Sequence, residues 1–184
     1  MKVVRSTTKN ITIHGVFLDI CGMGVLLLGK SGIGKSELAL ELINKGHALI
    51  ADDAVDFTLT KNNSINGCCP KLLKDFLEIR GPGILNIRKL FGAKAVKASK
   101  KLDLIIEVLN HKNNLEADRL SCKNQKQNIL GAEINTIFVR LIPGISLATL
   151  IEVTVRNFQL SQNGYCATEE FIKRQRAIME GTTA

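Results

Sequence analysis

Eight residues near the start of the chain have the types and spacing of a phosphate-binding loop. The segment GKSGIGKS at positions 29–36 matches the pattern G-x-x-x-x-G-K-[ST] in full. Its glycines allow backbone angles that a side chain would forbid, so that amide N–H groups can converge on phosphate oxygens. In this pattern Lys35 reaches the β- and γ-phosphates, and the Ser36 hydroxyl is a ligand for Mg²⁺. The candidate residues of this phosphate loop are Gly29, Lys30, Ser31, Gly32, Ile33, Gly34, Lys35 and Ser36.

The segments on either side of the phosphate loop are the ones that such a loop requires. Residues 25–28 form a continuous apolar run that is typical of a buried strand. Residues 36–43 combine strong helix formers with an apolar face, and Lys45-Gly46 indicates where that helix ends. The alternative is a chance glycine-rich turn, and the correct flanking elements argue against it.

The next strand, expected at residues 47–51, ends in two adjacent carboxylates, Asp52 and Asp53. Such a strand would deliver them to the phosphate-binding edge of the sheet. A carboxylate at this place in phosphate-loop proteins holds the metal or activates a nucleophile. Two carboxylates beside a triphosphate also repel each other, which raises the pKa of one and suits it to act as a base. The alternative is a solvated turn, and we favour the functional interpretation.

Three further polar residues are weaker candidates when only their spacing is considered. Glu78 precedes a glycine-rich turn and could be a second metal ligand, although glutamate is usually a surface residue. His14 lies in an expected strand, where a lone histidine is usually structural. Arg119 lies in a polar segment and would by default be solvated, although an arginine near a transferring phosphate stabilises transition-state charge.

The composition indicates a globular domain and disfavours several functional classes. The 184 residues are 45% hydrophobic, and no apolar run reaches transmembrane length and no signal peptide is present. The five cysteines lack metal-binding spacing, which favours a reducing, cytoplasmic compartment. A net charge of +8 could favour nucleic acid, but aromatic residues make up only 4% and leave little for base stacking. A basic face for an acidic protein or for phosphate groups explains the charge equally well.

The remaining pattern predicts one α/β domain with a mixed sheet and flanking helices. We expect strands at residues 11–20, 56–60, 102–109 and 134–142, and helices at residues 146–160 and 168–179. Between them we expect a short helical turn at 70–76, a loop of fixed shape at 77–86, and an irregular polar segment at 110–130. Ser146 is the expected N-cap of its helix.

Several segments, taken in order, resemble the catalytic domain of the HPr kinase/phosphorylases. They are His14-Gly15, the phosphate loop, residues 46–53, 77–84 and 90–92, Asp118-Arg119-Leu120, residues 150–153, and Asn157-Phe158. The sequence Glu-Ile-Arg-Gly at 78–81 is the most specific of these segments, and the resemblance covers nearly the whole chain. The resemblance implies a phosphate-loop fold of the phosphoenolpyruvate carboxykinase type. It also implies a single catalytic domain over residues 1–184, without the family's usual N-terminal domain.

The same resemblance implies roles for the matching residues. Lys35 and the loop amides would bind ATP or pyrophosphate, and Ser36 and Glu78 would be the Mg²⁺ ligands. Asp53 resembles the base that takes the proton from a serine hydroxyl of the phosphocarrier protein HPr. In the reverse direction it would protonate that serine oxygen while inorganic phosphate attacks phosphoserine and gives pyrophosphate. Family members assemble as hexamers, so a homo-oligomer is expected by resemblance.

His14 and Arg119 match the family's remaining active-site residues, whereas three positions depart from its usual pattern. Lys30 stands where the family usually has an aspartate. Ile142 and Ile145 stand where the family usually has two basic residues around a Pro-Gly turn, and that turn is tied to the dephosphorylating direction. We therefore expect the kinase reaction to be better supported than phosphorolysis.

The leading hypothesis is an ATP- and Mg²⁺-dependent protein-serine kinase that acts on HPr. A non-catalytic sensor that binds nucleotide or phosphate is the second hypothesis, and Lys30 would suit it. A small-molecule kinase is the third. The basic helix expected at residues 168–179 would contact HPr or a neighbouring subunit, with a solvated closing helix as the alternative.

Overall fold

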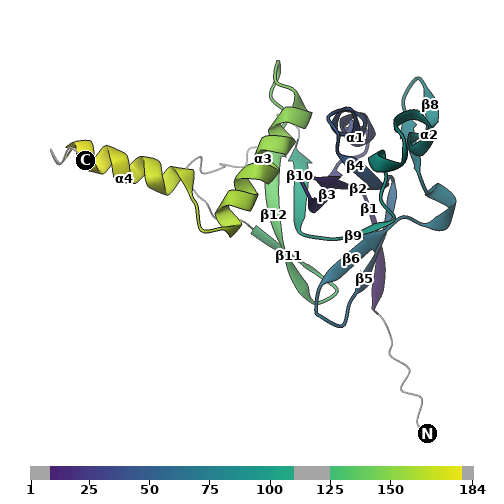
Figure 1. Cartoon of the computed structure of the whole chain (residues 1–184), viewed down its shortest axis with the longest axis horizontal. Helices are drawn as coiled ribbons and strands as arrows, with labels where there is room; N and C mark the ends of the chain where they lie inside the picture. The colour runs from purple at the N-terminus through teal and green to yellow at the C-terminus, as the bar shows by residue number, and fades with distance from the viewer. Residues whose placement is uncertain (1–8, 110–124, 180–184) are drawn as a thin grey trace, which may run out of the picture.

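The computed structural model describes residues 9–109 and 125–179, which form a layered α/β arrangement (Figure 1). The central layer is a six-stranded sheet in which β10 is parallel to both β3 and β12, while the other neighbours are antiparallel. This confirms the prediction of a mixed sheet with flanking helices. The order of its strands is β11 (Gln125–Ile129), β12 (Ala132–Arg140), β10 (Leu104–Leu109), β3 (Met23–Gly29), β2 (Val16–Ile20) and β4 (Ala48–Ala51).

A smaller antiparallel sheet covers one face of the central sheet, and a separate hairpin lies near the phosphate loop. The smaller sheet has the order β1 (Asn10–His14), β5 (Ala54–Leu59), β6 (Ile65–Cys68) and β9 (Ser99–Lys101). The hairpin pairs β7 (Phe76–Ile79) with β8 (Gly83–Asn86). The helices are α1 (Lys35–Asn44), α2 (Ile87–Phe91), α3 (Leu147–Gln162) and α4 (Ala167–Met179), with 3₁₀ turns at Lys71–Leu73 and Ala93–Ala95.

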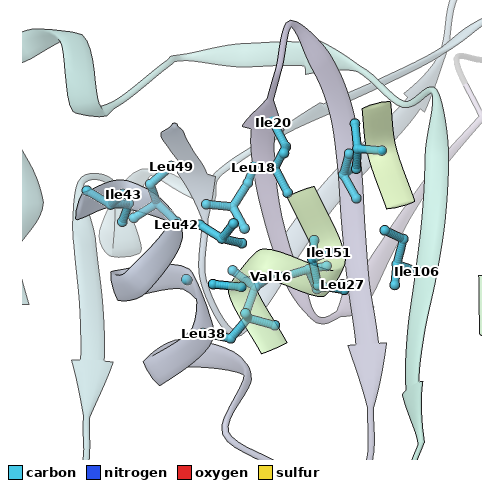
Figure 2. Close-up of a cluster of buried hydrophobic side chains, with 14 of the residues drawn as sticks. Val16, Leu18, Ile20, Leu27, Leu38, Leu42, Ile43, Leu49, Ile106 and Ile151 are labelled. Carbon is cyan, nitrogen blue, oxygen red and sulfur yellow. The ribbon is translucent and has the colours of Figure 1, made fainter. Parts of the chain in front are cut away.

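Strand β2 is buried on both faces, which explains why four of its five residues are apolar, Asp19 being the exception. Because successive side chains of a strand point to opposite faces, Val16 and Leu18 join the cluster beneath α1 and α3, as Figure 2 shows. Phe17 points to the other face and packs edge-to-face on Phe57 of β5, with ring centroids 5.3 Å apart. The sheet therefore has two hydrophobic cores, one beneath the helices and one against the smaller sheet.

The predicted single strand at residues 11–20 is wrong, because the chain breaks at Gly15 into β1 and β2. These two strands pair in different sheets. A Cβ atom at Gly15 would lie 2.8 Å from the Leu27 carbonyl oxygen, so the chain can cross β3 this closely only with glycine. The break matters for the site, since it leaves His14 at the end of β1, where the chain enters the central sheet.

The predicted loop at residues 77–86 is also wrong in part, because its two arms pair as the β7–β8 hairpin. Leu77 and Ile79 are buried and alternate with the exposed Glu78, which is the two-residue period of a strand. The irregular segment predicted at 110–130 is wrong at its end, where β11 pairs with β12. Its first part lies outside the described residues. The helical turn predicted at 70–76 is confirmed over Lys71–Leu73, whereas Phe76 already belongs to β7. The Ser146 cap of α3 is confirmed.

Two features bear on the class of protein. Within residues 9–109 and 125–179, no helix is long and apolar enough to cross a membrane. Cys21, Cys68 and Cys69 are free thiols, whereas Cys166 is disulfide-bonded.

Candidate functional site

The phosphate loop connects the end of β3 to the start of α1 at the edge of the central sheet. Its glycines Gly29, Gly32 and Gly34 have φ angles of 152°, 78° and 91°, the conformations for which glycine was expected. Gly34 is the N-cap of α1 and no side chain caps this end, so the first N–H groups of the helix remain available to an anion. Lys35 is buried, and its Nζ donates to the Gly29 carbonyl oxygen at 3.0 Å. Gly34 and Lys35 both line a cleft beside the loop.

A cleft of about 230 Å³ lies against the phosphate loop and brings most of the candidate residues together. It joins the loop to His14 from β1, to Asp53 after β4, and to Glu78 from β7. Arg119 lies outside the described residues, and Gly29, Lys30 and Ile33 do not line the cleft. The lining residues are His14, Val16, Ser31, Gly32, Gly34, Lys35, Ser36, Glu37, Asp52, Asp53, Glu78 and Arg80.

Asp52 is the buried carboxylate of the cleft and links two candidate metal ligands. Its side chain accepts hydrogen bonds from the Ser36 hydroxyl at 3.1 and 3.2 Å and from the Glu78 backbone N–H at 3.2 Å. Burial raises the pKa of Asp52 above its ordinary value, partly opposed by these hydrogen bonds, while the charge of Asp53 adds a small further rise. The predicted repulsion between the two aspartates therefore exists, but burial is the main cause of the shift. Asp52 is thus placed to orient Ser36 and the Glu78 backbone.

Asp53 faces solvent at the mouth of the cleft, next to His14. Its φ angle of 66° is unusual for a residue other than glycine, and such strained positions cluster at functional sites. The His14 Nδ1 atom lies 3.0 Å from the Asp53 carboxylate and 2.8 Å from its carbonyl oxygen. Because both oxygens only accept hydrogen bonds, Nδ1 must be the nitrogen that carries the proton. The side chain of Asp53 is 73% exposed, so a large substrate can reach it.

The β7–β8 hairpin supplies an arginine that belongs to the specific Glu-Ile-Arg-Gly segment but has no role among the sequence predictions. Arg80 directly follows β7 and lines the cleft together with Glu78. A Cβ atom at Gly32 would lie 3.1 Å from the Arg80 guanidinium, so this cation reaches the phosphate loop. Glu78 and Arg80 are two residues apart, which puts them on one side of an extended chain. That alternation with the buried Leu77 and Ile79 was the signal that could have identified Arg80.

Comparison with known proteins matches residues 5–175 to the family model described as the HPr Serine kinase C-terminal domain. The chain belongs to this family. It is 45% identical over 180 residues to the HPr kinase/phosphorylase of Ralstonia nicotianae, an alignment that covers 98% of this chain and 55% of the relative. It is 46% identical over 176 residues to the HPr kinase/phosphorylase of Cupriavidus metallidurans, covering 96% and 54%. The HPr serine kinase C-terminal domain thus spans about half the length of these curated relatives.

A solved member of the same group supports the fold. The structure of the Hpr(Ser) kinase/phosphatase from Coxiella burnetii matches with a TM-score of 0.79 and 39% identity, covering 88% of this chain and 98% of that chain. The resemblance inferred from the residues is therefore confirmed. The departures Ile142 and Ile145 lie in the described residues, where both side chains are about half exposed and neither lines the cleft.

Proposed function

We propose that this domain is an ATP- and Mg²⁺-dependent kinase that phosphorylates a serine of HPr. The observation that carries the proposal is a single cleft that joins a phosphate-binding loop to an exposed aspartate–histidine pair. The first element suits a nucleotide and the second suits a protein hydroxyl. The curated relatives, named HPr kinase/phosphorylase, identify HPr as the substrate to test first. We further propose a fold of the phosphoenolpyruvate carboxykinase type and a cytoplasmic location.

The loop and Arg80 would bind the nucleotide phosphates. The uncapped N-terminus of α1 offers backbone donors at its positive end, and Lys35 adds a buried cation that donates to the carbonyl oxygens of Gly29 and Lys30. Phosphate oxygens would replace these carbonyl contacts. Arg80 reaches the same loop from the hairpin and would stabilise charge on the transferring phosphoryl group.

The residues present also fit a Mg²⁺ ion, because hydroxyl and carboxylate oxygens are the ligands it prefers. Ser36 and Glu78 would hold the ion, with Asp52 fixing both through the hydrogen bonds described above. When bound, the ion would neutralise charge on the phosphate oxygens. This assignment explains why a carboxylate as buried as Asp52 lies here with hydrogen-bond donors and, in the part of the chain that the structure describes, no ion-pair partner.

Asp53 would act as the base toward the serine hydroxyl. The serine O–H proton moves to the Asp53 carboxylate as the serine oxygen bonds to the γ-phosphorus and the bond to the leaving ADP oxygen breaks. The His14 Nδ1–H donates toward the same carboxylate and holds it in place. Inorganic phosphate as the attacking group would reverse these roles, with Asp53 returning the proton to serine and pyrophosphate as the product. Arg119, outside the described residues, is expected to assist with charge.

One transfer assay separates the candidate functions. The protein is incubated with radiolabelled ATP, Mg²⁺ and HPr, alongside the Asp53→Asn variant and a control, Asp56→Asn, whose aspartate lies outside the cleft. The kinase proposal expects label on an HPr serine, loss of label with Asp53→Asn, and retention with Asp56→Asn. ATP binding without any transfer would support the regulatory sensor and overturn the proposal. Transfer to a small metabolite but not to HPr would support the small-molecule kinase instead.

The direction of the reaction is a separate part of the proposal. Ile142 and Ile145 replace basic residues in the turn that the family ties to dephosphorylation, so phosphorolysis of phosphoserine-HPr should be slower than phosphorylation. A double variant, Ile142→Arg with Ile145→Arg, should raise phosphorolysis relative to the kinase rate. Equal rates in the two directions for the unmodified protein would contradict this part alone.

We also propose that the domain forms a homo-oligomer, as the resemblance to hexameric proteins implies. Helix α4 projects from the rest of the described chain, and none of its residues is buried (Figure 1). It nevertheless exposes the apolar side chains of Phe171, Ile178 and Met179. Light scattering after size-exclusion chromatography should give a mass several times that of one chain, and a monomeric mass at micromolar concentration would contradict the proposal.

A further inference from the structure

A cluster of three potential metal ligands lies at the end of the molecule opposite the phosphate loop. Cys21 is in the turn between β2 and β3, His47 lies between α1 and β4, and Glu152 is on α3. Strand β3 and helix α1 both have the phosphate loop at one end and this cluster at the other. The ten residues of α1 place the two sites about 15 Å apart along the helix axis. The cluster is therefore separate from the proposed catalytic cleft.

The three side chains converge on one point although they are distant in sequence. Their potential ligand atoms all lie within 4.8 Å of one another. The His47 Nε2 atom is 3.9 Å from the Glu152 carboxylate, which is beyond hydrogen-bond distance. A tetrahedral Zn²⁺ ion with bonds of about 2.0–2.3 Å separates its ligand atoms by about 3.3–3.8 Å. The observed separations need only a small inward movement of the side chains to match this geometry.

His47 supplies an independent indication that something is bound here. The residue is only 8% exposed, and its Nε2 atom is buried with no hydrogen-bond partner among residues 9–109 and 125–179. A buried polar atom without a partner costs free energy, and native proteins rarely leave one unsatisfied. The other ring nitrogen, Nδ1, has only a contact of 3.5 Å with the Cys21 backbone N–H, at the outer limit of a hydrogen bond. The ring can therefore exchange this weak contact for a ligand bond through Nε2.

We propose that Cys21, His47 and Glu152 form a binding site for a divalent cation of the zinc class. One thiolate, one imidazole and one carboxylate are a ligand set that suits Zn²⁺, and a water molecule would complete four-coordination. On binding, the Cys21 thiol releases its proton to solvent as the sulfur–metal bond forms. The thiolate and carboxylate together balance the charge of the cation. The ion would join the β2–β3 turn, the end of α1 and helix α3 at one point.

Two cations already contact Glu152 and must be accommodated. Lys45 lies 3.2 Å from Oε2, and Arg156 lies 3.0 Å from Oε1, the oxygen that faces His47. The metal would take Oε1, so it competes with Arg156 and not with Lys45. The Arg156 side chain is 62% exposed and one turn away on the same helix, where an exposed ion pair contributes little. Its displacement into solvent is therefore a small cost compared with ligation.

The test uses Co²⁺ and Zn²⁺ with the full chain, after removal of adventitious metal with a chelator. Cobalt bound by a thiolate has a sulfur-to-metal charge-transfer band in the near ultraviolet, which reports Cys21 directly. We expect this band at one equivalent, displaced by Zn²⁺, with metal affinity lowered at least about tenfold in Cys21→Ser and in Glu152→Gln. Cys68→Ser is the matched control, because Cys68 is also a partly buried free thiol and should leave the band unchanged.

A second measurement covers the case in which a variant folds poorly. In the unmodified protein, Zn²⁺ should slow alkylation of Cys21 while leaving alkylation of Cys68 unaffected, as peptide mass spectrometry would show. The absence of a thiolate band, or equal protection of both cysteines, would overturn the proposal. Circular dichroism of each variant confirms that it is folded before its affinity is compared.

Discussion

Two carboxylates are buried to nearly the same extent at opposite ends of the central sheet, and they lie in contrasting surroundings. Asp19 near the end of β2 is 5% exposed, and Asp52 after β4 is 6% exposed. Asp19 forms ion pairs with Lys97 and with Lys100, the latter at 2.9 Å. Asp52 accepts hydrogen bonds from neutral groups, and among the described residues it forms no ion pair within 4 Å.

The two environments move the pKa values in opposite directions. Burial raises the pKa of Asp19, but hydrogen bonds and charge from Lys97 and Lys100 outweigh it and lower the pKa below its ordinary value. Burial raises the pKa of Asp52, and its hydrogen bonds only partly oppose this. A paired buried charge stabilises the fold, whereas an unpaired one lowers stability unless a cation arrives. The difference indicates that the phosphate end of the sheet is adapted to a ligand and the other end to structure.

The largest expected effect is on the rate of phosphoryl transfer, and it is expected at the exposed Asp53 and not at the buried Asp19 or Asp52. Asp53→Asn removes the proposed base and should lower the rate of phosphoryl transfer to HPr by about 10³-fold, within the range for a general base. Thermal stability should change little, because the Asp53 side chain is 73% exposed. Steady-state kinetics with HPr and differential scanning calorimetry measure the two quantities. A rate within threefold of the unmodified protein would remove Asp53 from the mechanism.

The Asp52→Asn variant should lower the rate less than Asp53→Asn does, and it should raise the stability of the fold. The amide keeps the shape but loses the charge that orients Ser36, so kcat should fall about 10- to 100-fold, as for other groups that hold metal ligands. The midpoint of thermal unfolding should rise, because an uncompensated buried charge has been removed. Added Mg²⁺ with nucleotide should stabilise the unmodified protein more than the variant. A drop in stability would show that Asp52 has a structural role like that of Asp19.

The corresponding change at the opposite end of the central sheet is Asp19→Asn. It should lower the free energy of unfolding by about 2 kcal/mol, the scale for hydrogen bonds to charged groups, while the kinase rate stays unchanged. The loss is limited because the Lys97 side chain is 47% exposed and can turn to water. Urea unfolding monitored by circular dichroism gives the free energy. A variant as stable as the unmodified protein would mean that the lysines contribute nothing net.

The sequence predicted the phosphate end better than it predicted the opposite end, for a physical reason. The phosphate loop and Asp52-Asp53 are contiguous, and their spacing is imposed by the ligand, so local patterns identify them. Asp19 and Lys97 come together only because β2 and the segment before β9 meet in three dimensions. The convergence of Cys21, His47 and Glu152 depends on tertiary structure in the same way. No local period or propensity encodes such contacts.

Two of the errors in strand assignment have related causes. Residues 11–20 read as one strand because the segment is rich in β-branched residues, and only the tight approach at Gly15 to β3 divides it. The β7–β8 hairpin was missed because its Gly-Pro-Gly turn dominates a short segment, although Leu77 and Ile79 carry the two-residue period. Missing the hairpin also concealed Arg80. Arg80 is two residues after Glu78 and lies on the same side of the extended chain, so recognising the strand would have placed Arg80 as well.

The smallest expected effect is the pH dependence of the stability changes caused by Asp19→Asn and Asp52→Asn. For Asp19 the folded-state pKa lies below the ordinary value of 3.8, so its stabilisation is complete above that value and is lost as the pH falls through the lowered pKa. For Asp52 the folded-state pKa lies above 3.8, so its cost is absent below 3.8 and develops as the pH rises through the raised pKa.

Thermal unfolding of both asparagine variants between pH 3 and pH 7 should therefore show the stability loss of Asp19→Asn shrinking at the acid end. The stability gain of Asp52→Asn should shrink there too, so the two curves converge on the unmodified protein from opposite sides. If the curves of both variants ran parallel to that of the unmodified protein, neither aspartate would have a different pKa in the folded and unfolded states.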